Sequence, residues 1–316
     1  MSTFLITGAT GYIGRMITRR LLEQNHDVTV IVRNKNKLCD FMKYSVQIIE
    51  ADLVNLEAVC QISGDYEYLI HCAAATQSSY MMSNPVEVAG SIVNGTQNVL
   101  TLAVRCHAQS MVYLSSMEVY GQIDCSEGKK VTEEELGSVD ISKIRSCYPM
   151  AKRMAENFCH IYHHEYGVPV KIARLAQTFG RGVREEDNRI FAQFARSVRE
   201  NKDIILHTQG NSVGNYCDTD DAVDAILFLL ENGKSSEAYN IVNEANTMTI
   251  REMAEMVTDK IANGEIGVTY NIPKDNQYGY AAETGLRLSG SKMKKLGWEA
   301  KTGLEEMYRK MIGNWF

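Results

Sequence analysis

The sequence predicts an α/β fold: a doubly wound parallel (Rossmann) sheet with a smaller mixed C-terminal lobe. Short apolar runs alternate with longer helical patterns through the first half of the chain. The runs are apolar at consecutive positions, which is typical of parallel strands covered on both faces. A glycine-rich turn follows the first run directly, where a doubly wound sheet places one. We expect residues 1–175 to form the parallel-sheet domain and residues 176–316 the lobe, with some lobe segments returning to the sheet.

The apolar spacing predicts the individual elements. In the first domain we expect strands at residues 3–7, 27–32, 46–50, 68–72, 110–115 and 168–174, and helices at residues 12–24, 86–106 and 148–166. After residue 175 the rhythm changes. Helical patterns at 188–200, 219–232, 249–263 and 302–313 then alternate with short strand candidates at 203–207, 238–242 and 266–271.

Composition excludes several classes of protein. The 316 residues are 45% apolar and 23% charged with a net charge of −6, which is typical of a globular chain and not of a disordered one. No run approaches the length of a membrane helix, and the acidic balance argues against nucleic acid as an obligatory partner. The start MSTFLITGAT lacks the basic region of a secretory signal, and the 8 cysteines form no Cys-x-x-Cys pair. We therefore expect a cytoplasmic protein with free thiols and no metal site.

The turn after the first strand has the composition of a phosphate cradle. Gly8 permits a tight turn, Gly11 lets the backbone approach a diphosphate, and Gly14 lets the helix pack closely on the sheet. The start of the following helix directs backbone N–H groups toward an anion. Residues 1–175 are therefore predicted to bind a dinucleotide, and residues 176–316 are predicted to bind the substrate. The predicted contacts in the turn are Gly8, Thr10, Gly11, Tyr12, Ile13 and Gly14.

Three further positions refine the cofactor prediction. Dinucleotide folds usually carry an acidic residue after the second strand, where it binds the ribose 2′-hydroxyl, but this chain has Arg33. An arginine attracts a 2′-phosphate, so NADP is favoured over NAD, unless Arg33 belongs to a solvated basic loop. Asp52 and Leu53, after the third strand, are candidates for the adenine edge. Ala73 and Ala74, after the fourth, would let the cofactor lie close.

A proton-handling group is predicted where Tyr148 and Lys152 stand four residues apart on one helix face. A tyrosine has a pKa of about 10 and needs a drop of roughly 3 units, or about 4 kcal/mol, to act as a base near neutrality. Lys152 and a cationic nicotinamide ring are the expected source of that drop. Ser116, at the end of the fifth strand, is placed to orient a substrate hydroxyl, because ligands bind beyond the carboxyl ends of parallel strands.

Five motifs now carry a family resemblance. TGATGYIG, HCAAA, SSMEVYG, YPMAK and a late LGW come in an order and spacing that resembles the extended short-chain dehydrogenase/reductase family, and within it the NAD(P)-dependent nucleotide-sugar epimerases and dehydratases. The resemblance covers nearly the whole chain. It implies transient oxidation of a nucleotide sugar at C4 by hydride transfer, with Tyr148 as base and Lys152 holding a ribose. It also implies a homodimer through two helices of each subunit, and Met150 and Met154 fit a second covered helix face.

The resemblance leaves the reaction open. We expect an epimerase-type enzyme, with a 4,6-dehydratase, a decarboxylase or an NADPH-dependent 4-keto-sugar reductase as alternatives. Glu118 matches the glutamate of decarboxylases, which RSCYPMAKRMAE (residues 145–156) also resembles. Met117 stands where dTDP-glucose dehydratases have a proton-donating aspartate, and methionine has no proton to give. From another class, a cofactor-sensing binding module would not need the tyrosine–lysine pair.

Substrate contacts are less well defined by the resemblance. Gly214 replaces the arginine that usually contacts the substrate diphosphate, and Gln177 replaces an asparagine after the sixth strand. Arg189 and Arg287 stand where family members often place nucleotide contacts, so they and Gln177 are the predicted substrate-binding residues. Arg181 and Arg184 are further candidates to supply the missing charge.

Overall fold

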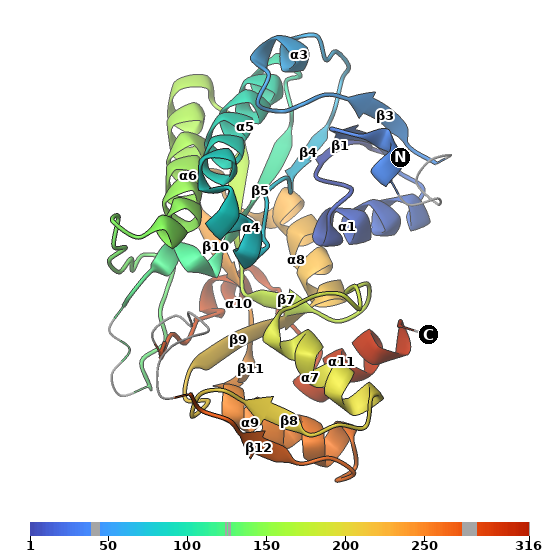
Figure 1. Cartoon of the computed structure of the whole chain (residues 1–316). Coiled ribbons are helices and arrows are strands. Elements are labelled where there is room, and N and C mark those ends of the chain that lie inside the picture. The colour runs from blue at the N-terminus through green and yellow to red at the C-terminus, as the bar shows by residue number, and fades with distance from the viewer. Residues whose placement is uncertain (39–44, 124, 126–127, 274–282, 316) are drawn as a thin grey trace. The chain divides into compact units, whose positions relative to one another are not determined.

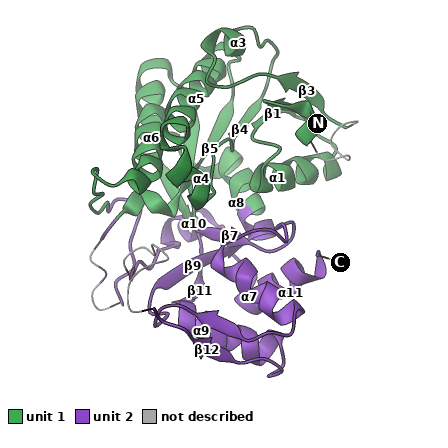
Figure 2. Ribbon diagram, viewed as in Figure 1, with its two compact units in different colours: residues 1–121, 136–175, 223–240 green, residues 122–135, 176–222, 241–316 purple. Residues whose placement is uncertain are grey.

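The computed structural model describes residues 1–38, 45–123, 125, 128–273 and 283–315 (Figure 1). It divides into two compact units (Figure 2). Unit 1 contains residues 1–121, 136–175 and 223–240, and unit 2 contains residues 122–135, 176–222 and 241–316.

Unit 1 is built on a seven-stranded sheet in the order β10-β6-β5-β4-β1-β2-β3. Neighbouring strands from β6 to β3 are paired in parallel. The order reverses between β1 and β4, which is the point where doubly wound sheets bind ligands. The predicted fold class is confirmed. The strands are β1 (Thr3–Thr7), β2 (Asp27–Val32), β3 (Gln47–Glu50), β4 (Tyr68–His71), β5 (Ser110–Ser116), β6 (Val170–Leu175) and β10 (Ala238–Ile241).

Helices connect these strands as the crossovers of a parallel sheet. Figure 1 shows α5 and α6 lying side by side along the sheet, and they pack closely on each other. Pro85 starts α5, where its missing N–H costs no hydrogen bond, and left-handed Gly167 ends α6. The helices are α1 (Tyr12–Glu23), η1 (Lys35–Lys37), α3 (Leu56–Cys60), α4 (Ser78–Ser83), α5 (Pro85–Arg105), η2 (Met117–Tyr120), η4 (Ile144–Ser146) and α6 (Cys147–Tyr166).

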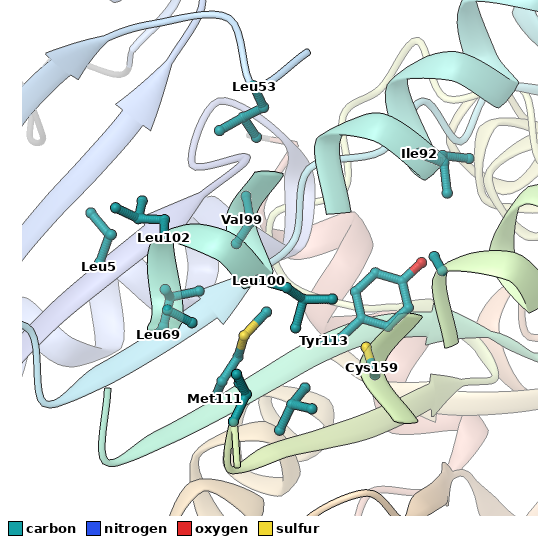
Figure 3. Close-up of a cluster of buried hydrophobic side chains, with 14 of the residues drawn as sticks. Leu5, Leu53, Leu69, Ile92, Val99, Leu100, Leu102, Met111, Tyr113 and Cys159 are labelled. Carbon is teal, nitrogen blue, oxygen red and sulfur yellow. The ribbon is translucent and has the colours of Figure 1, made fainter. Parts of the chain in front are cut away.

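One hydrophobic core cluster of unit 1 lies between the sheet and the pair α5–α6. Leu5, Leu69 and Met111 come from the sheet, Leu100 from α5 and Cys159 from α6, and all are fully buried (Figure 3). Each cysteine in the described ranges is a free thiol. No helix in these ranges is both long and apolar enough to cross a membrane.

Unit 2 is mixed, as expected, but its sheets are only partly predictable. A three-stranded sheet has the order β11-β9-β7, and β12 pairs with β8. The predicted helix 249–263 is α9 followed by a π-helical turn, η5. The elements are β7 (Gln177–Phe179), α7 (Ile190–Arg199), β8 (Ile204–Leu206), β9 (Val213–Asp218), β11 (Asn243–Thr249), α9 (Ile250–Met256), η5 (Val257–Ile261), β12 (Val268–Tyr270), α10 (Ser291–Leu296) and α11 (Leu304–Gly313). Helix α8 (Thr219–Asn232) starts in unit 2 and continues into unit 1.

Candidate active site

The glycine cradle (residues 8–14) joins β1 to α1 and needs glycine at two positions. Gly8 has φ +76°, and a Cβ there would lie 2.7 Å from the backbone nitrogen of Ala73. A Cβ on Gly14 would overlap the carbonyl oxygen of Gly8. Any side chain at these positions would push the first turn of α1 away from the ends of β1 and β4.

The start of α1 suits an anion. Gly11 precedes the helix in an extended conformation and has no side chain to cap it, and the first turn of α1 carries no acidic residue. The first backbone N–H groups of a helix have no carbonyl partner within the helix, and together they carry a partial positive charge. The cradle therefore fits the diphosphate of a dinucleotide.

The other predicted cofactor residues lie at the same end of the sheet. Ala73 follows β4 against Gly8, and its N–H donates to Thr7 Oγ1 over 3.4 Å. Leu53 is buried, and its carbonyl accepts a hydrogen bond of 2.8 Å from Asn98 Nδ2 on α5. Asp52 Oδ1 accepts from the Val54 N–H over 3.1 Å, which closes the turn after β3. These contacts fix the backbone after β3 and after β4, and the β4 end lies against Gly8 of the cradle.

Arg33 directly follows β2 and is exposed. Its Nη1 lies 3.6 Å from Glu87 Oε1 of α5, and Glu87 Oε2 accepts a hydrogen bond of 2.6 Å from the Tyr80 hydroxyl. A pair this exposed contributes at most about 1 kcal/mol to folding stability. The arginine is therefore held only weakly.

The tyrosine cluster consists of Ser116, Glu118, Arg145, Tyr148 and Lys152. Ser116 ends β5, and its Oγ accepts from the Glu118 N–H over 3.2 Å, so it also caps η2. Burial raises the pKa of Tyr148 above its usual value, and the negative charge of Glu118 raises it further. A hydrogen bond from Ser116 and the charge of Arg145 lower that pKa. The structure thus brings the predicted Ser116, Glu118 and Tyr148 together.

Lys152 is buried behind the tyrosine. Its Nζ donates a hydrogen bond of 2.7 Å to the Leu114 carbonyl and lies 4.7 Å from the ring centroid of Tyr113. The same Nζ is 5.9 Å from the ring centroid of Tyr148. Burial lowers the pKa of Lys152 to about 8, while Glu156 opposes this shift. The predicted effect of Lys152 on the pKa of Tyr148 stays a prediction, and Arg145 is a further cation beside the tyrosine, whose charge lowers that pKa.

Arg145 was not singled out from the sequence, although it opens the segment RSCYPMAKRMAE. Its Nη2 donates to Glu118 Oε1 over 2.8 Å, and its Cζ lies 5.6 Å from the ring centroid of Tyr148. Its position three residues before the tyrosine was the available signal. The spacing alone does not show that the short turn η4 carries the guanidinium back over the ring.

A buried ion pair between Glu156 and Arg174 lies next to the tyrosine cluster. Glu156 lies one turn after Lys152, and it accepts from Arg174 Nη2 over 2.7 Å and from Ser115 Oγ over 2.5 Å. Arg174 Nη1 donates to the Tyr120 hydroxyl over 3.2 Å, and that hydroxyl donates to Asn240 Oδ1 over 2.6 Å. The network joins α6 to the ends of β5, β6 and β10, so it fixes the backbone that carries Ser116 and Glu118.

The predicted substrate residues all belong to unit 2. Gln177 starts β7 and is paired in register with Tyr216 of β9. Arg189 precedes α7, forms a two-pronged ion pair with Asp187, and stacks 4.6 Å from the centroid of the Phe191 ring. Arg287 is half-buried, and its carbonyl accepts from the Val131 N–H over 2.7 Å. The predicted role of all three in substrate binding stays a prediction.

Gly214, the position of the missing arginine, lies in β9. A Cβ at this position would overlap the ring and hydroxyl of Tyr216. That hydroxyl is buried without a hydrogen-bond partner, and burial raises its pKa above the usual value. A side chain at residue 214 would therefore have to displace the Tyr216 ring.

Comparison with known proteins now defines the family. Residues 4–242 match the family model described as NAD dependent epimerase/dehydratase family. UDP-glucuronic acid decarboxylase 6 of Arabidopsis thaliana is 28% identical over 305 residues, which are 96% of this chain and 85% of the relative. UDP-glucuronic acid decarboxylase 1 of Xenopus tropicalis is 27% identical over 309 residues, or 98% of this chain and 70% of the relative.

Solved structures share the fold. UDP-glucose 4-epimerase of Thermotoga maritima, solved with UDP-glucose, superposes with a TM-score of 0.85 at 21% identity over 98% of this chain and 97% of that chain. The dTDP-glucose 4,6-dehydratase of Streptomyces venezuelae, solved with NAD, gives a TM-score of 0.80 at 21% identity over 99% and 96% of the two chains. The resemblance inferred from the motifs is confirmed. The chain is an enzyme of the NAD dependent epimerase/dehydratase family.

Proposed function

We propose that this enzyme binds a nucleotide sugar and oxidises its C4 hydroxyl transiently, as an epimerase-type catalyst. One observation carries the proposal: the tyrosine cluster joins a buried Tyr148, hydrogen-bonded by Ser116, to Lys152 at the carboxyl end of β5. This end of the sheet also carries the glycine cradle, since parallel strands end at one edge. A cofactor-sensing module would need the cradle but not this cluster.

The side chains divide the work. Ser116 orients the sugar hydroxyl, and Tyr148 Oη takes its proton as the C4–H bond breaks and the C4=O bond forms. The nicotinamide cofactor, when bound, supplies the hydride acceptor. Lys152 would hold the nicotinamide ribose. Tyr148 returns the proton when the C4 hydroxyl forms again, and return of the hydride to C4 in the same cycle would leave no net redox change.

Decarboxylation of a uronate is the second candidate. It is favoured by the decarboxylase names of the relatives and by Glu118, which lies beside Tyr148 in a 2.8 Å ion pair with Arg145. Oxidation at C4 would weaken the bond between C5 and the carboxylate, which leaves as carbon dioxide while C5 gains a proton. A 4,6-dehydratase is disfavoured because Met117, at the start of η2, has no proton to donate to a leaving hydroxide.

NADP preference belongs to the same proposal. Arg33 is exposed at the end of β2, where its guanidinium is available to a 2′-phosphate once Glu87 releases it. An NADPH-dependent 4-keto-sugar reductase would use the same contact and would consume the cofactor. The ratio of NAD to NADP dissociation constants in the wild type and in Arg33→Gln measures this preference.

A homodimer through α5 and α6 is also proposed. Met150, Met154 and Ile161 of α6 leave about two fifths of their surface exposed, although α6 packs on both α5 and the sheet. A two-fold partner that presents the same helices would cover these side chains. Light scattering at micromolar concentration would detect the dimer, and a monomer mass would contradict it.

Product analysis distinguishes the reactions. The purified protein is incubated separately with UDP-glucose, UDP-glucuronic acid and dTDP-glucose, while absorbance at 340 nm and proton NMR follow cofactor and sugar. A new sugar isomer without net cofactor change supports the epimerase, and a pentose with released carbon dioxide supports the decarboxylase. Net NADPH consumption contradicts both. Unchanged nucleotide sugars across the panel, with bound cofactor intact, would count against this substrate class.

A further inference from the structure

We propose that Arg145 is a second positioning cation for Tyr148, flanking the tyrosine ring together with Lys152 and held in place by Glu118. The inference rests on the proposed function, because it concerns Tyr148 as the base. The sequence resemblance includes Arg145 in the segment 145–156 but assigns it no role.

The geometry fixes the guanidinium over the ring. Arg145 lies in η4, directly before α6, and its Cζ is 5.6 Å from the Tyr148 ring centroid. One arm, Nη2, is held by Glu118 Oε1 at 2.8 Å. The other arm, Nη1, is buried with no hydrogen-bond partner. An unpartnered buried N–H is unfavourable, but a planar guanidinium over an aromatic face recovers part of that energy.

Lys152 is poorly placed to lower the pKa of Tyr148 alone. Its Nζ is committed to the Leu114 carbonyl and lies nearer to the ring of Tyr113 than to that of Tyr148. Burial brings the lysine pKa to about 8, so its charge is partly lost slightly above neutral pH. An arginine keeps its charge at every pH at which the protein is folded. Arg145 is therefore the more persistent cation beside the phenol.

The elements packed around Tyr148 bring few other charges. Helix α5 carries charge only at its two ends, on Glu87, which accepts from Tyr80, and on Arg105, which donates to the Val59 carbonyl. Strand β5 contributes the phenol of Tyr113 but no charged side chain. The charged residues of β6 are engaged elsewhere: Lys171 with Ser110, and Arg174 with Glu156. On the elements packed around α6, Glu118 of η2 and Arg145 of η4 are the charged residues that shift the pKa of Tyr148. Lys152 lies on the tyrosine's own helix, with Nζ 5.9 Å from the Tyr148 ring centroid.

These two charges act in opposite directions. Glu118 raises the pKa of Tyr148, and Arg145 lowers it. The two members of the ion pair therefore have separate effects on the pKa of Tyr148. It keeps the cation over the ring, while the carboxylate limits how far the phenol is acidified. Removing either member should move the ionisation of Tyr148, and removing both should leave it near its original value.

The test is a double-mutant cycle read by the pH dependence of kcat/KM. Arg145→Gln should move the acid limb upward by about one pH unit, since an opposite charge at this range typically lowers a pKa by 1–3. Glu118→Gln should move it downward, and the double variant should lie between them. Arg145→Lys keeps the charge and should keep the limb near its wild-type position. Lys143→Gln, which removes an exposed cation just before η4, should leave it unchanged.

A readout without substrate separates this inference from the proposed function. Protein labelled with 13Cζ-tyrosine and loaded with oxidised cofactor is titrated by NMR, and the resonance absent from Tyr148→Phe identifies the residue. An upward midpoint in Arg145→Gln supports the inference even if no nucleotide sugar is turned over. Equal midpoints in Arg145→Gln and wild type overturn it, even if turnover is normal. Should Arg145→Gln fail to fold, Glu118→Gln decides: a lower midpoint supports the inference and an unchanged one overturns it.

Discussion

The glycine cradle and the tyrosine cluster both belong to unit 1, yet they are specified in opposite ways. The cradle works because side chains are missing: a Cβ on Gly8 would lie 2.7 Å from the Ala73 backbone. The tyrosine cluster works because charged side chains lie next to a buried phenol. Lys152 is buried, and the partly exposed Glu118 lies within hydrogen-bond reach of Arg145. One region is defined by steric exclusion and the other by electrostatics.

The difference determines how each region responds to substitution. In the cradle, an added methyl group moves backbone, so stability and cofactor binding should change together. In the cluster, removal of one oxygen leaves the packing almost intact, so chemistry should change while folding and cofactor binding do not. Three predictions test this contrast.

Tyr148→Phe should have the largest effect on activity. A positioned acid or base typically contributes 10²–10⁴-fold to rate, so kcat should fall by about that factor. Cofactor affinity, measured by calorimetry, should stay within about twofold, because the removed hydroxyl lies in the cluster and not in the cradle.

Tyr162→Phe is the matched control for that variant. Tyr162 lies on the same helix, α6, and its hydroxyl is 2.9 Å from Thr101 Oγ1. Loss of this hydrogen bond should cost about 1 kcal/mol of stability without lowering kcat. Full activity in Tyr148→Phe would show that the phenol is not the base.

The cradle could be predicted almost completely from the sequence. A glycine triplet directly after a first apolar strand restricts the backbone locally, so Gly8 and Gly14 fall where the pattern places them. Strand β10 shows the limit. Residues 238–242 read as a short strand of the lobe, and their pairing beside β6 depends on contacts with a distant segment. The sequence does not predict strands β9 and β11, because apolar and polar residues do not alternate regularly along them.

The tyrosine cluster could be predicted only in part. Spacing placed Tyr148 and Lys152 on one helix, and strand order placed Ser116 near them. The electrostatic properties of the cluster depend on burial, which the spacing does not show. Burial lowers the pKa of Lys152 to about 8, and the Lys152 amine donates a hydrogen bond to the Leu114 carbonyl. Arg145 reaches the ring only because η4 turns the chain back, which no local pattern indicates.

Gly14→Ala should have the next largest effect. Its Cβ would overlap the Gly8 carbonyl oxygen, and overpacking of this kind costs about 1–3 kcal/mol. The unfolding free energy and the cofactor affinity should fall together. Gly90→Ala is the control, because the nearest atom to its Cβ would be Asn94 Nδ2 at 4.0 Å in helix α5. That change should raise stability by roughly 0.5–1 kcal/mol. Equal stability of the two variants would contradict steric exclusion as the basis of the cradle.

The smallest predicted effect is a pH dependence of stability at the β4 end. His71 is buried between Thr7 Oγ1 at 2.6 Å and Thr96 Oγ1 at 3.1 Å, and burial lowers its pKa from 6.5 to about 3. Between these two values the unfolded chain binds a proton that the folded chain does not, so stability is lost as pH falls below 6.5.

Each pH unit in that window should remove up to about 1.4 kcal/mol through His71. Denaturant unfolding from pH 7.5 to 5.5, above the range where most carboxylates titrate, should show a steeper decline in wild type than in His71→Gln. The comparison depends on the slopes and not on the absolute stabilities, because the substitution also removes ring packing against Tyr113. Parallel declines would mean that His71 takes up its proton at the same pH in the folded chain as in the unfolded chain. The β4 end next to the cradle would then accept a charge below pH 6.5, and the contrast between the two regions would fail.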